Sequence, residues 1–486
     1  MLYLLLLAVL LPLLGGVALA FLHPKRIGTV KISIEVMAIC TAVLVWTLLF
    51  VLPEEELTLV RFSNALSLSL RLDGLGKVFA GMTSFMWPLA LLYAFTYLRE
   101  DPRQGIFYTL YLMTFGVVLG IAFAANALTM YVFYESLTFI TLPLITHTGT
   151  KEARHAGRNY LYYSLSGSTL ALAGIVILTV GAGHNGFIAG GYIGEQDWLT
   201  QAAYLMLFFG FGVKTAVFPL YRWLPRAAAA PTPTTALLHA VAVVKSGAFA
   251  VMRMTFYCFV PDQLPGTIAQ TVSLLTAAFT VVYGSAKAVA EKHFKRRFAY
   301  STVSNLSYIL LGVLLCTWEG LDAAILHFII HSMTKIAIFF ACGAIIETAG
   351  TQYVFELNGL GKKMPVIFTL FTLAGLSLIG IPLFGGFVSK YYLIRSAFLQ
   401  GSAASYIGIA ALILSAVMTA VYVLSVTVRA FIRTPVAGCE ALYEGAKEPV
   451  TGFLWVTGLF TVIAVALGIF ARPLVELIGT LTGGAV

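Results

Sequence analysis

Residues 209–247 read FGFGVKTAVFPLYRWLPRAAAAPTPTTALLHAVAVVKSG, and this stretch decides the fold. It continues an apolar run in which Lys214 is the single charge between Ala202 and Leu220. Prolines then interrupt the run, and each removes a helix hydrogen bond and clashes with the preceding turn. These are Pro219, Pro225, Pro231 and Pro233. The stretch therefore predicts an apolar helix that is broken close to a buried lysine.

The rest of the chain has the composition of a membrane protein. Of its 486 residues, 59% are hydrophobic and 10% are charged, whereas soluble domains carry about 25% charged residues. A membrane-spanning helix needs roughly 20 apolar residues, and about fourteen such runs are present. Their centres lie near residues 11, 42, 86, 114, 137, 170, 210, 246, 275, 308, 335, 376, 416 and 462. We therefore predict an all-α polytopic membrane protein with about 14 transmembrane helices, because backbone groups in lipid must bond internally.

Charge alternates between successive loops, which predicts an orientation. Loops after odd-numbered runs are basic. Loops after even-numbered runs are acidic or uncharged, and only Arg61 and Arg71 depart from this pattern. The positive-inside rule places the basic loops in the cytoplasm, so an even number of helices leaves both termini outside. The first apolar run lacks a basic segment before it and is predicted to be a retained helix rather than a signal peptide. We expect a prokaryotic cytoplasmic (inner) membrane.

The chain is predicted to form one membrane domain, 1–486, because no linker or low-complexity segment divides it. A second break is expected in the twelfth helix, where residues 375–394 read GLSLIGIPLFGGFVSKYYLI, with Pro382, Gly385 and Gly386. The two breaks lie five helices apart, as in transporters built from inverted repeats. The predicted parts are 1–104 with three helices and an external β-hairpin at 54–73, a first inverted repeat at 105–260 (helices 4–8), a second at 264–432 (helices 9–13), and a last helix at 450–472.

Ionisable residues lie in the middle of several predicted spans. They are Glu135, Lys214, Lys245 near His239, Lys390, and the series His327, His331 and Lys335 on one helical face. A charge at the bilayer centre costs on the order of 2.5–3.5 kcal/mol, so five charges facing lipid would cost roughly 12–18 kcal/mol. These groups must therefore face inward, where they form a polar axis in the membrane plane.

Such an axis is suited to protons. Burial disfavours the charged form of a lysine and a nearby carboxylate favours it, so a movement of Glu135 relative to Lys214 would change whether the lysine holds a proton. Histidines between lysines can relay protons near neutral pH. A structural ion pair remains the alternative for Glu135 and Lys214, and His239 alone is also typical of a hydrogen-bonded core histidine. Glu35 and Arg253 stay unassigned.

No residue pattern for a cofactor or a metal is present. The cysteines are scattered without a CxxC or a Cys/His ligand spacing, and neither a GxGxxG nor a P-loop occurs. The cysteines are Cys40, Cys258, Cys316, Cys342 and Cys439. We expect no cofactor, no metal and no catalytic redox centre in this chain, so that any iron–sulfur, nickel or flavin group belongs to a partner subunit.

Five stretches together resemble the antiporter-like subunits of respiratory complex I, a family that includes Mrp-type cation/proton antiporters and energy-converting membrane-bound hydrogenases. The resemblance covers about residues 70–435. The stretches are residues 209–247 above, YVFYESLTFITLPLITHTGTKEA (131–153), AYSTVSNLSYILLGV (299–313), HFIIHSMTKIAIFFACGAI (327–345) and GIPLFGGFVSKYYLI (380–394). The resemblance implies fourteen helices with two inverted five-helix repeats.

The resemblance also implies a role for each buried residue. Glu135 resembles the glutamate that pairs with the seventh-helix lysine, here Lys214. Lys245, with His239 close by, resembles the connecting lysine of the eighth helix. His327, His331 and Lys335 resemble the central relay, and Lys390 resembles the terminal residue of the twelfth helix, which opens to one side of the membrane.

Two departures narrow the subunit type. Lys390 excludes the type that ends in a glutamate, and the end at TLTGGAV predicts that a lateral amphipathic helix is lacking. We expect a proton-translocating subunit of a redox-driven complex, either complex I-like or an energy-converting hydrogenase, with other family members, small hydrophobic subunits and soluble redox subunits as partners. Two alternatives stay open: a subunit of an Mrp-type Na⁺/H⁺ antiporter, and a non-conducting scaffold subunit.

Overall fold

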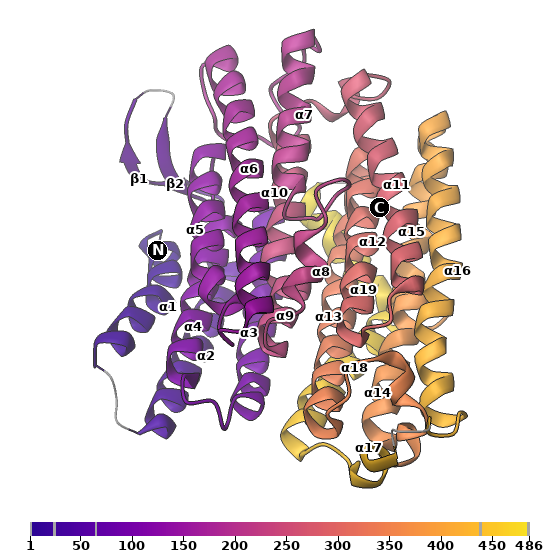
Figure 1. Ribbon diagram of the computed structural model, residues 1–486. Helices are drawn as coiled ribbons and strands as arrows, with labels where there is room; N and C mark the ends of the chain where they lie inside the picture. Colours follow the sequence, from indigo (N-terminus) through magenta and orange to yellow (C-terminus); the bar gives the residue numbers. More distant parts are fainter. Residues whose placement is uncertain (1, 23–25, 64–65, 437–439, 484–486) are drawn as a thin grey trace.

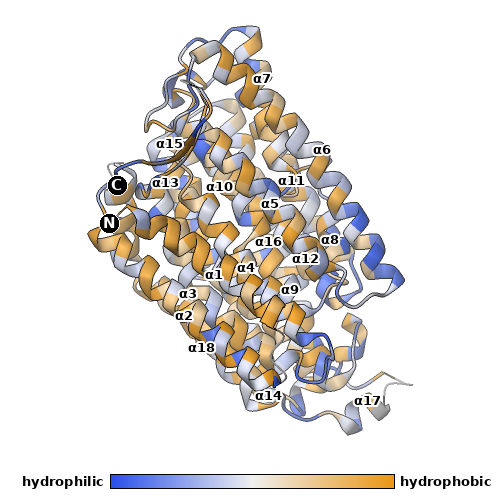
Figure 2. Cartoon of the chain, turned by 90° about the vertical axis from the view of Figure 1, so that its left-hand side faces the viewer, coloured by the Kyte–Doolittle hydropathy of each residue, from blue (hydrophilic) through white to orange (hydrophobic). Residues whose placement is uncertain are grey.

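Helices packed side by side make up nearly the whole molecule (Figure 1). The computed structural model describes residues 2–22, 26–63, 66–436 and 440–483, so that Cys439 lies outside the described residues. Apolar residues run along the lengths of the outer helices, and hydrophilic residues gather at the helix ends and loops (Figure 2). This distribution is the one expected of a helical bundle surrounded by lipid.

The N-terminal part holds three long helices and one hairpin. Its elements are α1 (Tyr3–Leu22), α2 (Ile27–Val51), β1 (Leu57–Arg61), β2 (Ser67–Leu70) and α3 (Gly74–Tyr97). The strands are antiparallel, with Leu57 opposite Leu70 and Arg61 opposite Ser67. They form the hairpin that the alternating pattern predicts. Asp73 then caps α3 by accepting a hydrogen bond from the Gly76 N–H.

The middle part contains the first broken helix. Its elements are α4 (Gln104–Ala122), α5 (Ala127–Ile145), α6 (Lys151–Ala182), α7 (Trp198–Gly212), α8 (Trp223–Ala227), α9 (Thr232–Ala236), the π-helix η1 (Leu237–Val241), α10 (Val243–Tyr257) and the short η2 (Pro261–Gln263). Pro219 lies in the irregular chain between α7 and α8, and Pro231 directly precedes α9. Pro225 and Pro233 lie inside α8 and α9, in first turns, where the missing N–H costs no hydrogen bond.

The second half contains another broken helix. Its elements are α11 (Ile268–Ala290), α12 (Phe294–Leu314), α13 (Trp318–Ala349), η3 (Val354–Leu357), η4 (Leu360–Lys362), α14 (Pro365–Ile379), α15 (Gly385–Gln400) and α16 (Ala403–Phe431). Pro382 lies between α14 and α15, whereas Gly385 and Gly386 are the first two residues of α15. The break is therefore shorter than the sequence predicts and ends before the glycine pair.

Three helices follow, and the last was not expected. They are α17 (Glu440–Gly445), α18 (Thr451–Ile469) and α19 (Ala471–Thr482). The predicted last helix, 450–472, thus ends earlier, and a separate helix folds back against α3 and α13. The helix α19 has only 12 residues and is therefore too short to span a membrane.

The predicted apolar runs all have their centres in helices. Eleven helices of the described residues are long and apolar enough to cross a membrane, and a bent pair at 354–379 brings the number to at most 12. Three helices at predicted run centres are not among these eleven. The helices α7 and α14 have only 15 residues each, and α12 carries the basic residues Lys295, Arg296 and Arg297 in its first turn. The polytopic all-α class is confirmed, and the number of crossings stays a prediction.

The loops meet in two separate groups. At one end, Arg71 N–H donates to the Phe123 carbonyl, and the Gln270 side chain donates to the Leu314 carbonyl. At the other end, the His147 imidazole contacts Asp101, and the Lys295 ammonium donates to the Ala230 carbonyl. The first group contains loops that follow even-numbered runs, and the second group contains loops that follow odd-numbered runs. Successive loops therefore lie at opposite ends of the bundle.

Candidate ion-translocation site

The predicted axis residues are buried in the interior of the bundle. Lys214, His239, Lys245 and Lys335 are fully inaccessible, and Lys390 is the most accessible of the four lysines of the axis at 8%. His327 and His331 are equally well buried, and Glu135 is half-buried. An isolated buried ammonium is costly, so the contacts of each residue decide what it can do.

Three of these residues form the centre of the site. Lys245 on α10 lies 2.9 Å from His331 Nδ1 on α13, and its ammonium also donates to the Phe328 carbonyl at 3.2 Å. The rings of His331 and His327 are 5.8 Å apart, because the two histidines are one helical turn apart on the same face of α13. The structure therefore brings Lys245, His331 and His327 together in one row.

The row continues to the second broken helix. His327 Nδ1 lies 2.9 Å from the hydroxyl of Ser389, the residue that precedes Lys390 on α15. Lys390 Nζ donates to the carbonyls of Leu378 and Ile379, at 2.9 and 2.8 Å. These carbonyls end α14 and lack intrahelical partners, and the partial negative charge there favours a cation. The helix break thus provides the acceptors that hold the buried lysine.

Lys335 and His239 lie beside this row. Lys335 Nζ donates to the Phe298 carbonyl at 3.0 Å and to the Ser301 hydroxyl at 2.8 Å, and Ser301 contacts the Tyr422 hydroxyl at 2.6 Å. The His239 ring packs on Phe339, and neither of its nitrogens has a hydrogen-bond partner among the described residues. Both groups can accept or pass a proton, but no direct hydrogen bond joins them to Lys245 in this arrangement.

Lys214 lies at the first break, where α7 ends. Its ammonium donates to the Tyr134 carbonyl and lies 3.5 Å from the centre of the Tyr134 ring. An ion pair with Glu135 is absent among the described residues, although the two charges act on each other electrostatically. Glu135 Oε1 is buried without a hydrogen-bond partner. Lys214 and Glu135 are therefore close enough to act on each other electrostatically but do not form an ion pair.

Helix α10 connects Lys214 to the central row. A Cβ atom at Gly247 would lie 3.0 Å from the Lys214 Cβ, so α10 approaches the first break as closely as a glycine allows. Lys245 is two residues from Gly247 on the same helix. In the part of the chain described, no hydrogen bond joins Lys214 to Lys245. The row is therefore not continuous between these two lysines.

Sequence reasoning missed several polar partners. Ser389, Ser301 and Tyr422 carry no charge and look like ordinary helix residues, although the position of Ser389 next to Lys390 is a signal that could have been read. Arg253 forms a two-pronged contact with Asp73, at 2.5 and 2.6 Å, and both side chains are buried. This pairing spans 180 positions in the sequence, which is why Arg253 had no obvious partner. Glu35 Oε2 stays without a partner in the described structure.

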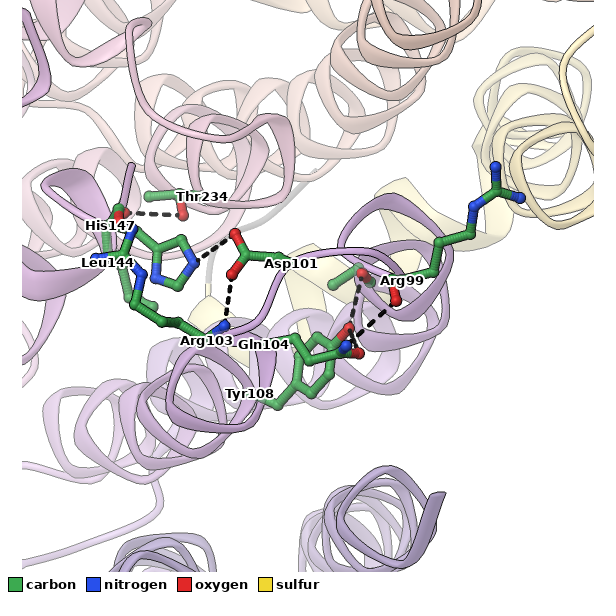
Figure 3. A network of polar contacts seen from close by, with 9 residues as sticks. Arg99, Asp101, Arg103, Gln104, Tyr108, Leu144, His147 and Thr234 are labelled. Atoms are coloured by element: carbon green, nitrogen blue, oxygen red, sulfur yellow. Dashed lines mark hydrogen bonds and ion pairs between the residues drawn. The ribbon is translucent and has the colours of Figure 1, made fainter. Parts of the chain in front are cut away.

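A second network of polar contacts lies at the end of the bundle where the loops of Asp101 and His147 meet, and it reaches the segment that follows the first helix break (Figure 3). Asp101 accepts from the Arg103 N–H at 2.7 Å and from His147 Nε2 at 3.1 Å, and the Arg103 side chain donates to the His147 carbonyl. Burial lowers the pKa of His147, and the Asp101 charge opposes this shift. Thr234 on α9 donates to the Leu144 carbonyl of α5, so the network joins the α3–α4 loop, the end of α5 and the segment after the break.

In the described part of the chain, no group of three or more His, Cys, Asp or Glu side chains could hold a metal ion. Imidazoles, ammonium groups and hydroxyls make up the buried row, and these groups exchange protons rather than coordinate a cation through oxygen. The chemistry that the row supports is proton transfer.

Comparison with known proteins gives consistent matches. The family described as NADH:quinone oxidoreductase/Mrp antiporter, TM, matches residues 124–419, more than half of the chain. The Na⁺/H⁺ antiporter subunit A1 of Staphylococcus aureus strain bovine RF122 / ET3-1 is 32% identical over 357 residues, which cover 70% of this chain and 44% of the relative. The chain thus spans less than half the length of the curated relatives it matches.

Solved structures share the fold. A chain of an archaeal membrane-bound sulfane sulfur reductase superposes with a TM-score of 0.86 at 22% identity, covering 99% of this chain and 97% of that chain. A chain of the Mrp complex of Dietzia sp. DQ12-45-1b gives 0.84 at 23% identity, covering 99% and 96%. A chain of respiratory complex I from Thermus thermophilus gives 0.80 at 24% identity, covering 99% of both chains.

Proposed function

Because the chain belongs to the NADH:quinone oxidoreductase/Mrp antiporter transmembrane family, we propose that it translocates protons as an antiporter-like subunit of a larger membrane complex. The proton route runs along Glu135, Lys214, Lys245, the group of His327, His331 and Lys335, and Lys390. His239 lies beside this route as an additional carrier. The side chains change protonation state in turn, and the chain itself carries out no redox step.

The observation that carries this proposal is the row in which Lys245 contacts His331, the rings of His331 and His327 lie 5.8 Å apart, and His327 contacts Ser389, next to Lys390. A structural role would need pairs that neutralise each other. Here ammonium groups face imidazoles and carbonyls instead, so that no carboxylate fixes the proton in place. Such a row can lose or gain a proton without breaking an ion pair.

In this proposal, proton transfer is controlled between Lys214 and Lys245. Closure of Glu135 on Lys214 favours a proton on the lysine, and separation of the pair releases that proton toward α10. The driving force is a change in a neighbouring subunit that moves Glu135. This coupling explains why the two groups lie near each other without being locked in an ion pair.

The proposed complex is redox-driven, with iron–sulfur, nickel or flavin groups only in partner subunits. The second candidate is a subunit of an Mrp-type Na⁺/H⁺ antiporter, and the 32% identity to an antiporter subunit A1 favours it. Both place the chain in a prokaryotic cytoplasmic membrane with the basic loops inside and both termini outside. Small hydrophobic subunits and other members of the same family are the expected partners in either case.

Gentle purification of the native complex separates the two candidates. Co-purifying soluble subunits that contain iron–sulfur or nickel would support the redox-driven complex and exclude the stand-alone antiporter. Small hydrophobic partners without any metal would support the antiporter and contradict the redox-driven reading.

Two substitutions test translocation itself. Lys214→Ala and Lys390→Ala are expected to abolish proton transport by the reconstituted complex while its assembly survives. Lys292→Ala is the matched control, because Lys292 is an exposed lysine in the α11–α12 loop. Unimpaired transport in both axis variants would instead identify the chain as a non-conducting scaffold.

A further inference from the structure

A small pocket lies beyond the Lys390 end of the row, between α13, α15 and α19. Its volume is about 90 Å³, and its lining includes Asp322, Tyr392, Arg395, Ser396 and Ile478. One water molecule takes about 30 Å³ in the liquid, so the pocket has room for water. Polar side chains from α13 and α15 face the apolar side chains of α19 across this space.

Asp322 is the acidic group that is buried in this pocket. Its side chain is nine-tenths buried, with 9% exposed. Oδ1 accepts a hydrogen bond from the Thr482 hydroxyl of α19 at 2.7 Å, and Oδ2 is buried with no partner among the described residues. A buried carboxylate oxygen without a donor is unfavourable while charged, and it is relieved when the group takes up a proton.

Two contacts show how close this pocket lies to the row. Helices α13 and α15 pack against each other, and His327 contacts Ser389 at 2.9 Å while the Ser396 hydroxyl donates to the Glu319 carbonyl at 3.0 Å. Asp322 lies between these two levels of the helix pair. It is five residues before His327, which corresponds to about 7.5 Å along the helix axis. The pocket therefore lies about 1.4 turns of α13 from His327, on the side at which the helix begins.

The charges around Asp322 suit a passing proton rather than a bound cation. Glu319 on α13 and Arg395 on α15 are the charged groups that line the described pocket, Tyr392 is its further titratable group, and α19 contributes the Thr482 hydroxyl and apolar side chains. Arg395 opposes a bound cation, and one half-satisfied carboxylate offers too few oxygens to hold one.

We propose that Asp322 carries protons between the His327–Lys390 end of the row and the membrane side at which α13 begins, with α19 closing the pocket. This inference rests on the proposed translocation function and assigns its terminal carrier. A proton leaves the protonated His327 or Lys390 and is taken up by the Asp322 carboxylate through the pocket water. The resulting carboxylic acid then releases it to water on the outer side, which regenerates the carboxylate, and no electron is transferred.

Proton transport by the complex, reconstituted into liposomes with a pH-sensitive dye inside, tests this role. Asp322→Asn is expected to lower the transport rate by at least about tenfold, the size of effect typical of a lost proton carrier. Asp322→Glu should restore most of the rate, since it keeps a carboxyl group. Asp262→Asn is the matched control, because Asp262 is exposed at the same end of the bundle. A wild-type rate in Asp322→Asn would overturn the proposal.

A second measurement does not depend on transport or on how well a variant folds. Dicyclohexylcarbodiimide modifies protonated carboxyl groups in apolar surroundings, and mass spectrometry of the wild-type complex locates the adduct. We expect an adduct on Asp322 and none on Asp262. An unmodified Asp322 across the pH range of activity would contradict the proposal.

The two proposals fail in different ways. Loss of transport in Lys214→Ala together with normal transport in Asp322→Asn would overturn the role of Asp322 and leave the proposed function intact. Normal transport in Lys214→Ala would overturn the proposed function, whatever the carbodiimide adduct shows.

Discussion

Lys214 and Lys390 are both buried beside the end of an interrupted helix. Lys390 Nζ donates to the two carbonyls that end α14, whereas Lys214 Nζ donates to the Tyr134 carbonyl inside α5, and neither lysine donates to a carboxylate of the described residues. A carbonyl lowers the cost of burying the charge without removing the option of losing it, whereas a carboxylate pair would hold the proton firmly. At the scale of the residue, both lysines are therefore held by carbonyls that leave their charge free to change, and the second break supplies these carbonyls itself.

Ser389 is the residue that joins His327 to the second break. Ser389→Ala removes the hydroxyl 2.9 Å from His327 Nδ1 and is expected to slow proton transport by about tenfold without affecting assembly. The measurement is the initial rate of transport in liposomes. Ser84→Ala is the control, since that buried hydroxyl bonds to the Gly81 carbonyl of its own helix α3, away from the row. Equal rates for both variants would show that protons bypass Ser389.

Gly380 follows α14 and has the backbone conformation that leaves the carbonyls at the end of this helix within reach of Lys390. Its φ is +90°, and a Cβ there would lie 3.0 Å from the Lys390 Cδ. Gly380→Ala adds backbone strain of about 1–3 kcal/mol and displaces the ammonium from the Leu378 and Ile379 carbonyls, so transport should fall. Gly401→Ala, at φ +72° in open space, carries similar strain away from any lysine. Loss of transport in both variants would point to strain alone.

At the scale of the element, each of the fourteen apolar runs predicts a helix correctly, because lipid leaves a single way to satisfy the backbone. The prolines likewise locate both breaks, although Pro225 and Pro233 turn out to start short helices and Gly385 opens α15. The helix α19 could not be predicted, since twelve residues of mixed character acquire their position only by packing on α3 and α13.

The candidate site was predictable only in part, for a similar reason. Charges in apolar runs are conspicuous, so Lys214, Lys245 and Lys390 are found from the sequence. Their partners are main-chain carbonyls and hydroxyls, which every helix contains, and only the fold decides which of them lie within reach. The same applies to Asp73, which looks like an ordinary helix cap until Arg253 is placed beside it.

The Asp73–Arg253 pair links the start of α3 to α10. Both side chains are buried, and breaking a buried ion pair by removing one partner costs about 3–5 kcal/mol. Arg71 lies 3.7 Å from the Asp73 carboxylate and offsets part of this cost when Arg253 is the residue removed. Arg253→Met and Asp73→Asn should each lower the thermal unfolding midpoint of the purified protein clearly. The double variant should lose less than the sum of the two changes. Additive losses would show that the pair contributes no coupling of its own.

At the scale of the whole molecule, the two predicted repeats can be compared helix by helix. Corresponding pairs pack in both, with α4 on α5 and α11 on α12, and with α6 on α7 and α13 on α14. Each half has a broken helix in its fourth place, and each break holds a buried lysine. Lys390 lies at one end of the row formed by Lys245 and the α13 histidines, and Lys214 lies beyond Lys245, across the interval that no hydrogen bond bridges in the described part of the chain. An inverted repeat would turn the breaks toward opposite membrane surfaces, which is the arrangement that a transporter needs.

The orientation of the whole molecule can be tested by labelling. Glu195 and Lys292 are exposed and lie in the two different groups of loops, because α7, α10 and α11 separate them. In a background without the five native cysteines, a membrane-impermeant maleimide applied to intact cells should label Glu195→Cys and spare Lys292→Cys, since basic loops stay inside. Inside-out vesicles should reverse the pattern. Labelling of Lys292→Cys alone in intact cells would invert the orientation, and labelling of both would contradict the three crossings between them.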